Sequence, residues 1–211
     1  MVNRNLWGVV AIVWLPTAAV AEAPPNRHRP LTEGHVRALV RQAARESRGG
    51  DATDLVLALD RRVRDAAGDF DALASAIVKR EDLLVTVSAP YMTFRRRLID
   101  ALRLPEERRR LDRVAWSSMV IVDVEPHRLG APDIESVTLT RAGRLVRPVY
   151  STLRPMTFTS GTGTRGVMHQ GEVHFATAAF LPGQPVVLAL SVAGGEPIVH
   201  TFDDASLALL C

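Results

Sequence analysis

The feature that most constrains the fold is a change of hydrophobic periodicity near Val114. From this residue on, short runs of β-branched and aromatic residues recur roughly every 8–12 residues, separated by glycine, proline and aspartate. Such spacing is typical of a β-sandwich or barrel. The dipeptides Ala142-Gly143 and Pro182-Gly183 predict turns between runs. Strands are expected at 119–124, 136–140, 145–150, 156–159, 173–180, 186–192 and 198–202.

The chain before Val114 has helical periodicity instead. Apolar residues between Val36 and Ala44 recur at i, i+3 and i+4, which places them on one face of a helix that Thr32 would cap. A second helix would begin at Asp51 or Thr53 and stop at Gly68. Further helices are expected over about 70–78 and 91–102, and a strand over 83–87.

These patterns predict an α+β protein, an N-terminal helical segment followed by an antiparallel, Ig-like β-sandwich domain. The expected division is a mainly helical segment over 31–113, with the strand at 83–87, and a sandwich-like domain over 114–211. The cysteine pair of antibody domains is missing, because Cys211 is the single cysteine, so only the sandwich architecture is inferred. The helical segment could be a separate domain or could cover the sheet.

Residues 1–21 carry every part of a secretory signal peptide. Arg4 supplies the positive charge, 6–15 is an apolar run, and the small residues around Ala21 predict cleavage after it. The run is shorter than the roughly 20 apolar residues of a membrane span, although an uncleaved anchor is the alternative. Residues 22–30 read as a Pro-rich linker. We therefore expect a bacterial protein exported to the periplasm or the medium, with no transmembrane span after signal removal.

Charge argues against nucleic-acid binding. The chain has 26 basic and 23 acidic residues, and its pI of 9.7 arises because nearly every base is arginine. The densest basic stretch is 94–113, where Arg96, Arg103 and Arg110 recur at sevens on one side of the predicted helices. These three are the candidate contacts with an anionic partner. The alternative is a solvated helix face, because acidic residues alternate with the arginines.

No catalytic, cofactor or metal site is predicted. The sequence 161–166 matches G-x-G-x-x-G, but no helix is expected after it, so it reads as a loop between strands. Glu172 and His174 would share one strand face without a third metal ligand. The pair Asp203-Asp204 reads as a turn just before a last strand.

The function predicted from these features is an exported, non-enzymatic binding or structural module for an unidentified ligand. Its partner would be an envelope protein, a glycan or an anionic surface. One alternative is a hydrolase of envelope polymers whose residues come from distant loops. Another is a membrane-surface protein that uses the arginine-rich helix.

Overall fold

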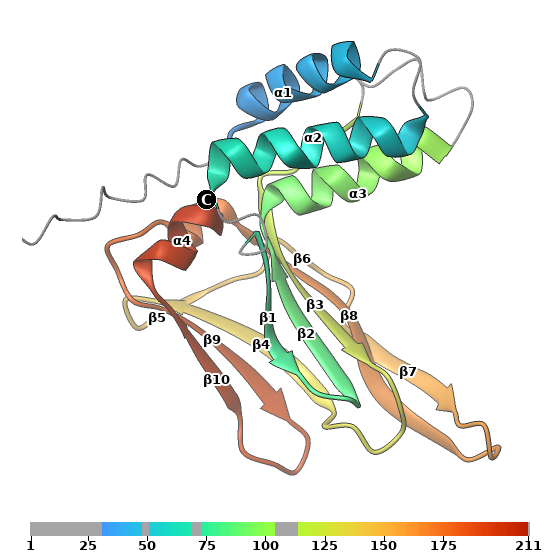
Figure 1. The fold of residues 1–211 in the computed structure, drawn as a ribbon. Helices are drawn as coiled ribbons and strands as arrows, with labels where there is room; N and C mark the ends of the chain where they lie inside the picture. Colours follow the sequence, from blue (N-terminus) through green and yellow to red (C-terminus); the bar gives the residue numbers. More distant parts are fainter. Residues whose placement is uncertain (1–30, 48–50, 69–72, 104–113, 211) are drawn as a thin grey trace, which may run out of the picture.

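The computed structural model describes residues 31–47, 51–68, 73–103 and 114–210. Three helices gather at one end of the molecule, and the strands extend away from them (Figure 1). The helices are α1 (Glu33–Glu46), α2 (Ala52–Ala67), α3 (Pro90–Arg103) and α4 (Asp204–Leu210), with a 3-10 turn η4 (Thr177–Phe180). The strands are β1 (Ala74–Lys79), β2 (Leu83–Ser88), β3 (Met119–Pro126), β4 (Ile134–Arg141), β5 (Arg144–Val146), β6 (Tyr150–Ser151), β7 (Arg154–Thr159), β8 (Arg165–Ala176), β9 (Val186–Val192) and β10 (Ile198–Phe202).

The strands form two antiparallel sheets. The first sheet has the order β1-β2-β3-β8-β6, and β7 also pairs with β8. The second sheet has the order β10-β9-β4-β5. Every pairing within both sheets is antiparallel. The expected combination of helices with antiparallel sheets is therefore confirmed.

Helices α1 and α2 begin at their predicted capping residues, and α2 ends at the predicted glycine. The Thr32 hydroxyl accepts a hydrogen bond from the backbone N–H of His35 at the start of α1. At the start of α2, Asp51 and Asp54 form a reciprocal capping box, which satisfies backbone donors that a helix leaves unpaired. Gly68, with φ of +85°, ends α2 in a conformation that favours glycine.

Alternation along the strands divides each sheet into a core face and an outer face. In β2, Leu83, Val85 and Val87 are buried, whereas Leu84, Thr86 and Ser88 face outward. In β3 the valines at 120, 122 and 124 are buried in the same way. The buried residues of both sheets and of the four helices form one hydrophobic cluster. The outer face of the first sheet thereby carries most of its polar side chains, together with Leu84 and Ile121.

The prediction of a helix over 70–78 is wrong, because Ala74–Lys79 forms the edge strand β1. Its apolar spacing also fits a helix, but pairing with β2 across a short turn overrides that local preference. The strand expected at 83–87 is β2, and its pairing with β3 carries the first sheet across residue 113. The division of the chain into domains at that point stays a prediction.

Other differences concern strand ends and the C-terminus. The run at 145–150 is divided between β5 and β6, which belong to different sheets. The run at 173–180 is the end of the longer β8 followed by η4. Asp203 accepts a hydrogen bond from the backbone N–H of Ser206 at the start of α4, a helix that the sequence pattern did not predict.

Within the described ranges, no helix has both the length and the apolar character needed to cross a membrane. The predicted signal peptide 1–21 with its cleavage site at Ala21, the linker 22–30, Arg110 and Cys211 all lie outside those ranges.

Candidate functional site

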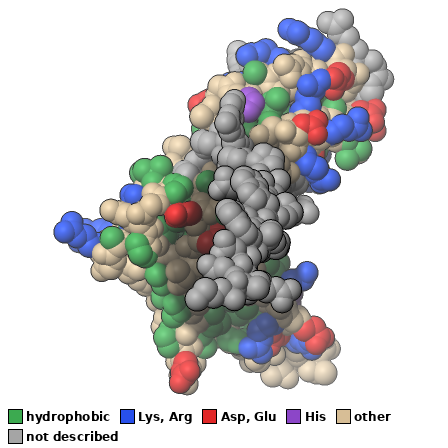
Figure 2. Space-filling model, turned by 60° about the vertical axis from the view of Figure 1, so that its left-hand side comes forward, with side chains coloured by type: hydrophobic (Ala, Val, Ile, Leu, Met, Phe, Trp, Pro, Cys, Tyr) green, Lys and Arg blue, Asp and Glu red, His purple; other side chains and the backbone are tan. Residues whose placement is uncertain are grey.

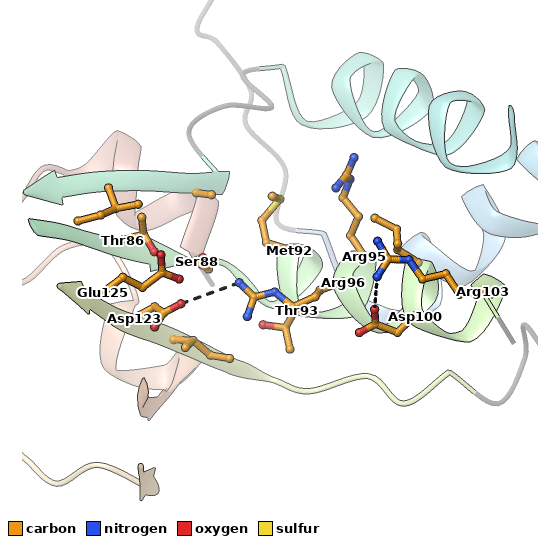
Figure 3. A pocket seen from close by; sticks show the side chains of 14 residues that line it. Thr86, Ser88, Met92, Thr93, Arg95, Arg96, Asp100, Arg103, Asp123 and Glu125 are labelled. Carbon is orange, nitrogen blue, oxygen red and sulfur yellow. Dashed lines mark ion pairs between the residues drawn. The ribbon is translucent and has the colours of Figure 1, made fainter. Parts of the chain in front are cut away.

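A groove of about 480 Å³ lies where α3 meets the outer face of β1, β2 and β3 (Figure 3). Its walls combine charged, hydroxyl and apolar side chains. The sheet contributes Ala74, Leu84, Thr86, Ser88, Ile121, Asp123 and Glu125, and α3 contributes Met92, Thr93, Arg95, Arg96, Ile99, Asp100 and Arg103. The groove exists because α3 follows β2 almost directly and leaves the end of the sheet instead of covering its face.

Three carboxylates lie on neighbouring strands at the floor of the groove and beside it. Asp123 of β3 is directly opposite Glu172 of β8, and Glu125 is two residues further along β3 on the same face. Like charges directly opposite each other destabilise a sheet. Arg96 of α3 offsets this repulsion, because its guanidinium lies 3.2 Å from Glu172 and 4.0 Å from Asp123.

Asp123 holds a proton more tightly than an ordinary aspartate. Burial of its carboxyl raises its pKa to about 7, and a hydrogen bond to Glu125 and the charges of Glu125 and Glu172 act in the same direction. Arg96 opposes these effects without cancelling them. Asp123 therefore exchanges its proton near neutral pH. A group with such a pKa is well suited to couple binding or catalysis to protonation.

The polar row continues from Glu172 toward the edge of the sheet. The Nε2 atom of His174 lies 2.8 Å from a carboxylate oxygen of Glu172. The ring of Tyr150 meets the His174 ring edge-on, with 5.4 Å between centroids. The sequence-based expectation that Glu172 and His174 share the polar face of one strand is thus confirmed.

A separate ion pair fixes α3 against α2. Asp60 of α2 accepts hydrogen bonds from the Arg95 guanidinium at 2.6 and 2.8 Å and from the Tyr91 hydroxyl at 2.9 Å. Burial, followed by the charge of Asp60, raises the pKa of Tyr91 far above its usual value, so the phenol stays protonated. This cluster holds the helix that carries Arg96.

Two of the three arginines predicted to contact an anionic partner come together along the groove. Arg96 is held by Asp123 and Glu172, and Arg103 lies 3.5 Å from Asp100 of its own helix (Figure 3). Arg110 is outside the described residues. The contact with an anionic partner stays a prediction.

The sequence pattern singles out Glu172 but does not group it with Asp123 and Glu125, because β3 and β8 are distant in sequence. The available signal was local: Asp123 and Glu125 alternate with buried valines, and Glu172 and His174 alternate in the same way on β8. Nothing in one strand indicates which residue of another lies opposite it.

The other motifs do not form a second site of this kind. The G-x-G-x-x-G stretch at 161–166 includes the turn between β7 and β8, which confirms its interpretation as a loop. His169 lies 3.0 Å from Asp133 through its Nδ1 atom. In the part of the chain that the structure describes, no three His, Cys, Asp or Glu side chains are placed to hold a metal ion.

Comparison with known proteins gives no functional assignment. No protein-family model and no curated protein matches the chain. One similar solved structure is a protein of unknown function from Burkholderia pseudomallei, which is 12% identical with a TM-score of 0.37 over 85% of this chain and 96% of that one. Another is a DUF4426-family protein from Pseudomonas aeruginosa, which is 11% identical with a TM-score of 0.24 over 62% of this chain and 91% of that one.

Proposed function

We propose that this chain is an exported binding module and that the groove between α3 and the first sheet is its ligand site. The observation that carries the proposal is the row of carboxylates at the groove, which costs stability and is only partly offset by Arg96. A groove lined by charged and apolar groups together is the kind of concavity in which small ligands bind.

The side chains that line the groove indicate which class of ligand fits it. Two of the three carboxylates share the Arg96 guanidinium, and the third, Glu125, lies beside them without contacting it, so the floor attracts a positively charged group. Met92, Ile99 and Ile121 add apolar surface nearby. A ligand with an amine or guanidine on a short apolar chain satisfies both parts of the groove.

We further propose that the two sheets form an Ig-like scaffold for this groove. From β3 onward the strand order supports this, because β3-β8-β6 matches B-E-D of an Ig domain and β10-β9-β4-β5 matches G-F-C-C′. β2 then occupies the place of strand A beside β3. The groove lies at the A–B side of that scaffold, where α3 joins it.

Titration calorimetry with a panel of amines, for example spermidine and lysine-containing dipeptides, tests the ligand site. Binding should weaken at least tenfold when Asp123→Asn and Glu172→Gln are combined, because two acceptors lose their charge. Glu135→Gln removes an exposed carboxylate elsewhere and is the matched control. Equal binding by the double variant and the control would contradict the assignment of the site.

Export is tested by the mass of the protein that accumulates in the cell. Replacing Ala21 with a large residue should leave a longer precursor in the membrane fraction, because signal peptidase requires a small residue there. An unchanged mature mass would place the cleavage site elsewhere.

A second candidate function is hydrolysis of an envelope polymer, favoured by the pKa of about 7 for Asp123. Such a carboxyl can donate a proton to a leaving group near neutral pH. A panel of glycan and peptide substrates tests it. Turnover that is abolished by Asp123→Asn would favour hydrolysis over binding alone.

A further inference from the structure

Charge is distributed unevenly along the β region. Between Ser136 and Gly171 the sequence contains five arginines and no aspartate or glutamate. The chain as a whole has 26 basic and 23 acidic residues, so the rest of it is net negative. A long segment of one charge sign within a nearly balanced chain indicates a surface that meets an oppositely charged partner.

The fold places the centre of this segment along one edge of the two sheets. β5 is the last strand of the second sheet, and β6 is the last strand of the first. Only residues 147–149 connect them, so the two edges are neighbours. β7 continues the same edge, because it pairs with β8 next to β6. We call residues 144–154 the edge strip.

The edge strip exposes large apolar side chains between its arginines. Leu145 is 66% exposed, Val149 58% and Tyr150 57%. Arg144, Arg147 and Arg154 are exposed as well, and none of the three forms an ion pair with another described residue. Exposed apolar residues gathered in one place are uncommon unless they serve an interaction.

Most arginines of α3 are used differently. Arg95, Arg96 and Arg103 of α3 all pair with carboxylates of the chain itself. Figure 2 shows acidic and basic side chains close together over the helical end of the molecule. Arg97, also of α3, donates to the backbone carbonyl of Ala115 instead of a carboxylate. Arginines without a carboxylate partner among the described residues also occur on α1 and α2, whereas those of the edge strip alternate with large exposed apolar side chains.

A shallow hollow at the β4–β5 turn strengthens this assignment. It is lined by Arg141, Ala142, Arg144, Leu145, Val146 and Gln184, and no carboxylate is among them. The Arg141 guanidinium donates to the carbonyl of Ala178 at 2.9 Å, which fixes its position. Two guanidiniums and one amide around a hollow of about 530 Å³ suit a phosphate group.

We propose that the edge strip docks on the surface of an anionic lipid bilayer. Its arginines bind lipid phosphates, while Leu145, Val149 and Tyr150 enter the interfacial region of the bilayer. A soluble polyanion would match the arginines but would gain nothing from three exposed apolar side chains. The combination of both kinds of residue on one edge therefore favours a membrane. This inference does not depend on the groove ligand.

Vesicle co-sedimentation of the purified full-length mature chain tests the proposal. The protein should bind vesicles of phosphatidylcholine with phosphatidylglycerol and should not bind pure phosphatidylcholine. Neutralising three arginines should weaken binding on the order of 100-fold, because each contributes to attraction by the anionic surface. The variant is Arg144→Gln, Arg147→Gln and Arg154→Gln, and the matched control neutralises the exposed helix residues Arg41→Gln, Arg45→Gln and Arg61→Gln.

A second variant separates a membrane from a soluble polyanion. Leu145→Ser with Val149→Ser keeps every charge, and both positions are exposed, so the fold should be retained. It should weaken vesicle binding at least fivefold and leave binding to soluble polyglutamate unchanged. Equal vesicle binding by this variant and the unmodified chain would overturn the membrane assignment in favour of a polyanion. Equal losses of vesicle binding in the two triple-arginine variants would show that the edge strip is not the docking surface.

Discussion

Replacing Asp123 with asparagine should change how the stability of the protein depends on pH. Asp123 has a pKa of about 7 in the folded protein and about 3.8 in the unfolded chain. The folded state therefore binds this proton more tightly. The resulting stabilisation is fully present below about pH 3.8 and is lost as pH rises through about 7.

The size of the effect follows from the difference between the two pKa values. Without solvent screening, the stabilisation of the folded state at low pH would be about 4 kcal/mol. Solvent at the open side of the groove reduces this stabilisation to about 2 kcal/mol. Asparagine has almost the same shape as aspartic acid but has no ionisable proton. Asp123→Asn should therefore remove this part of the pH dependence. Between about pH 4 and pH 8 the unmodified chain should lose about 2 kcal/mol more than the variant.

Urea unfolding at several pH values measures this difference directly. Asp100→Asn is the matched control, because Asp100 lines the same groove but is exposed and lies beside Arg103. Its stability curve should stay parallel to that of the unmodified chain. If the Asp123→Asn curve is also parallel, the carboxyl ionises normally in the folded protein, and the reasoning that links burial and carboxylate crowding to its protonation is refuted.

Three further changes test the packing that positions the groove. Asp60→Ala leaves the Arg95 guanidinium without its main acceptor, so the free energy of unfolding should fall by about 2 kcal/mol in urea titrations. Gly171→Ala would place a Cβ 2.6 Å from the Thr152 carbonyl oxygen, at a residue whose φ is +140°. The melting temperature should therefore fall by several degrees, and an unchanged melting temperature would contradict that close approach. Asp51→Ala removes the cap of α2 and should cost about 1 kcal/mol in the same urea titration, whereas Asp51→Asn should cost much less.

Local signals in the sequence predicted much of the fold. The strands 186–192 and 198–202 were predicted at the residues where they occur, because turn residues bound each run and the apolar residues alternate. The helix expected at 70–78 failed because Ala74–Lys79 gains its structure from pairing with β2. The structure of such an edge strand depends on pairing with its neighbour, and the apolar spacing of the strand itself does not contain that information.

The candidate site was predictable only in part, for a related reason. The spacing of Arg96 and Arg103 placed them on one side of a helix, and both line the groove. The carboxylate row depends on the register that sets Asp123 opposite Glu172. That register is a property of two paired strands, so it became visible only with the sheet assembled.

The helical layer and the groove should act as one unit, because α3 connects them through neighbouring residues. Arg95 turns toward Asp60 of α2, and Arg96 turns toward Asp123 and Glu172 of the sheet. If Asp60→Ala loosens α3, Arg96 spends less time near Asp123, and the pKa of that carboxyl should rise further above about 7. A carboxyl NMR titration of Asp123 in the folded variant measures this. An unchanged midpoint would mean that the sheet alone sets the protonation of Asp123, and the helices would then have no part in tuning the groove.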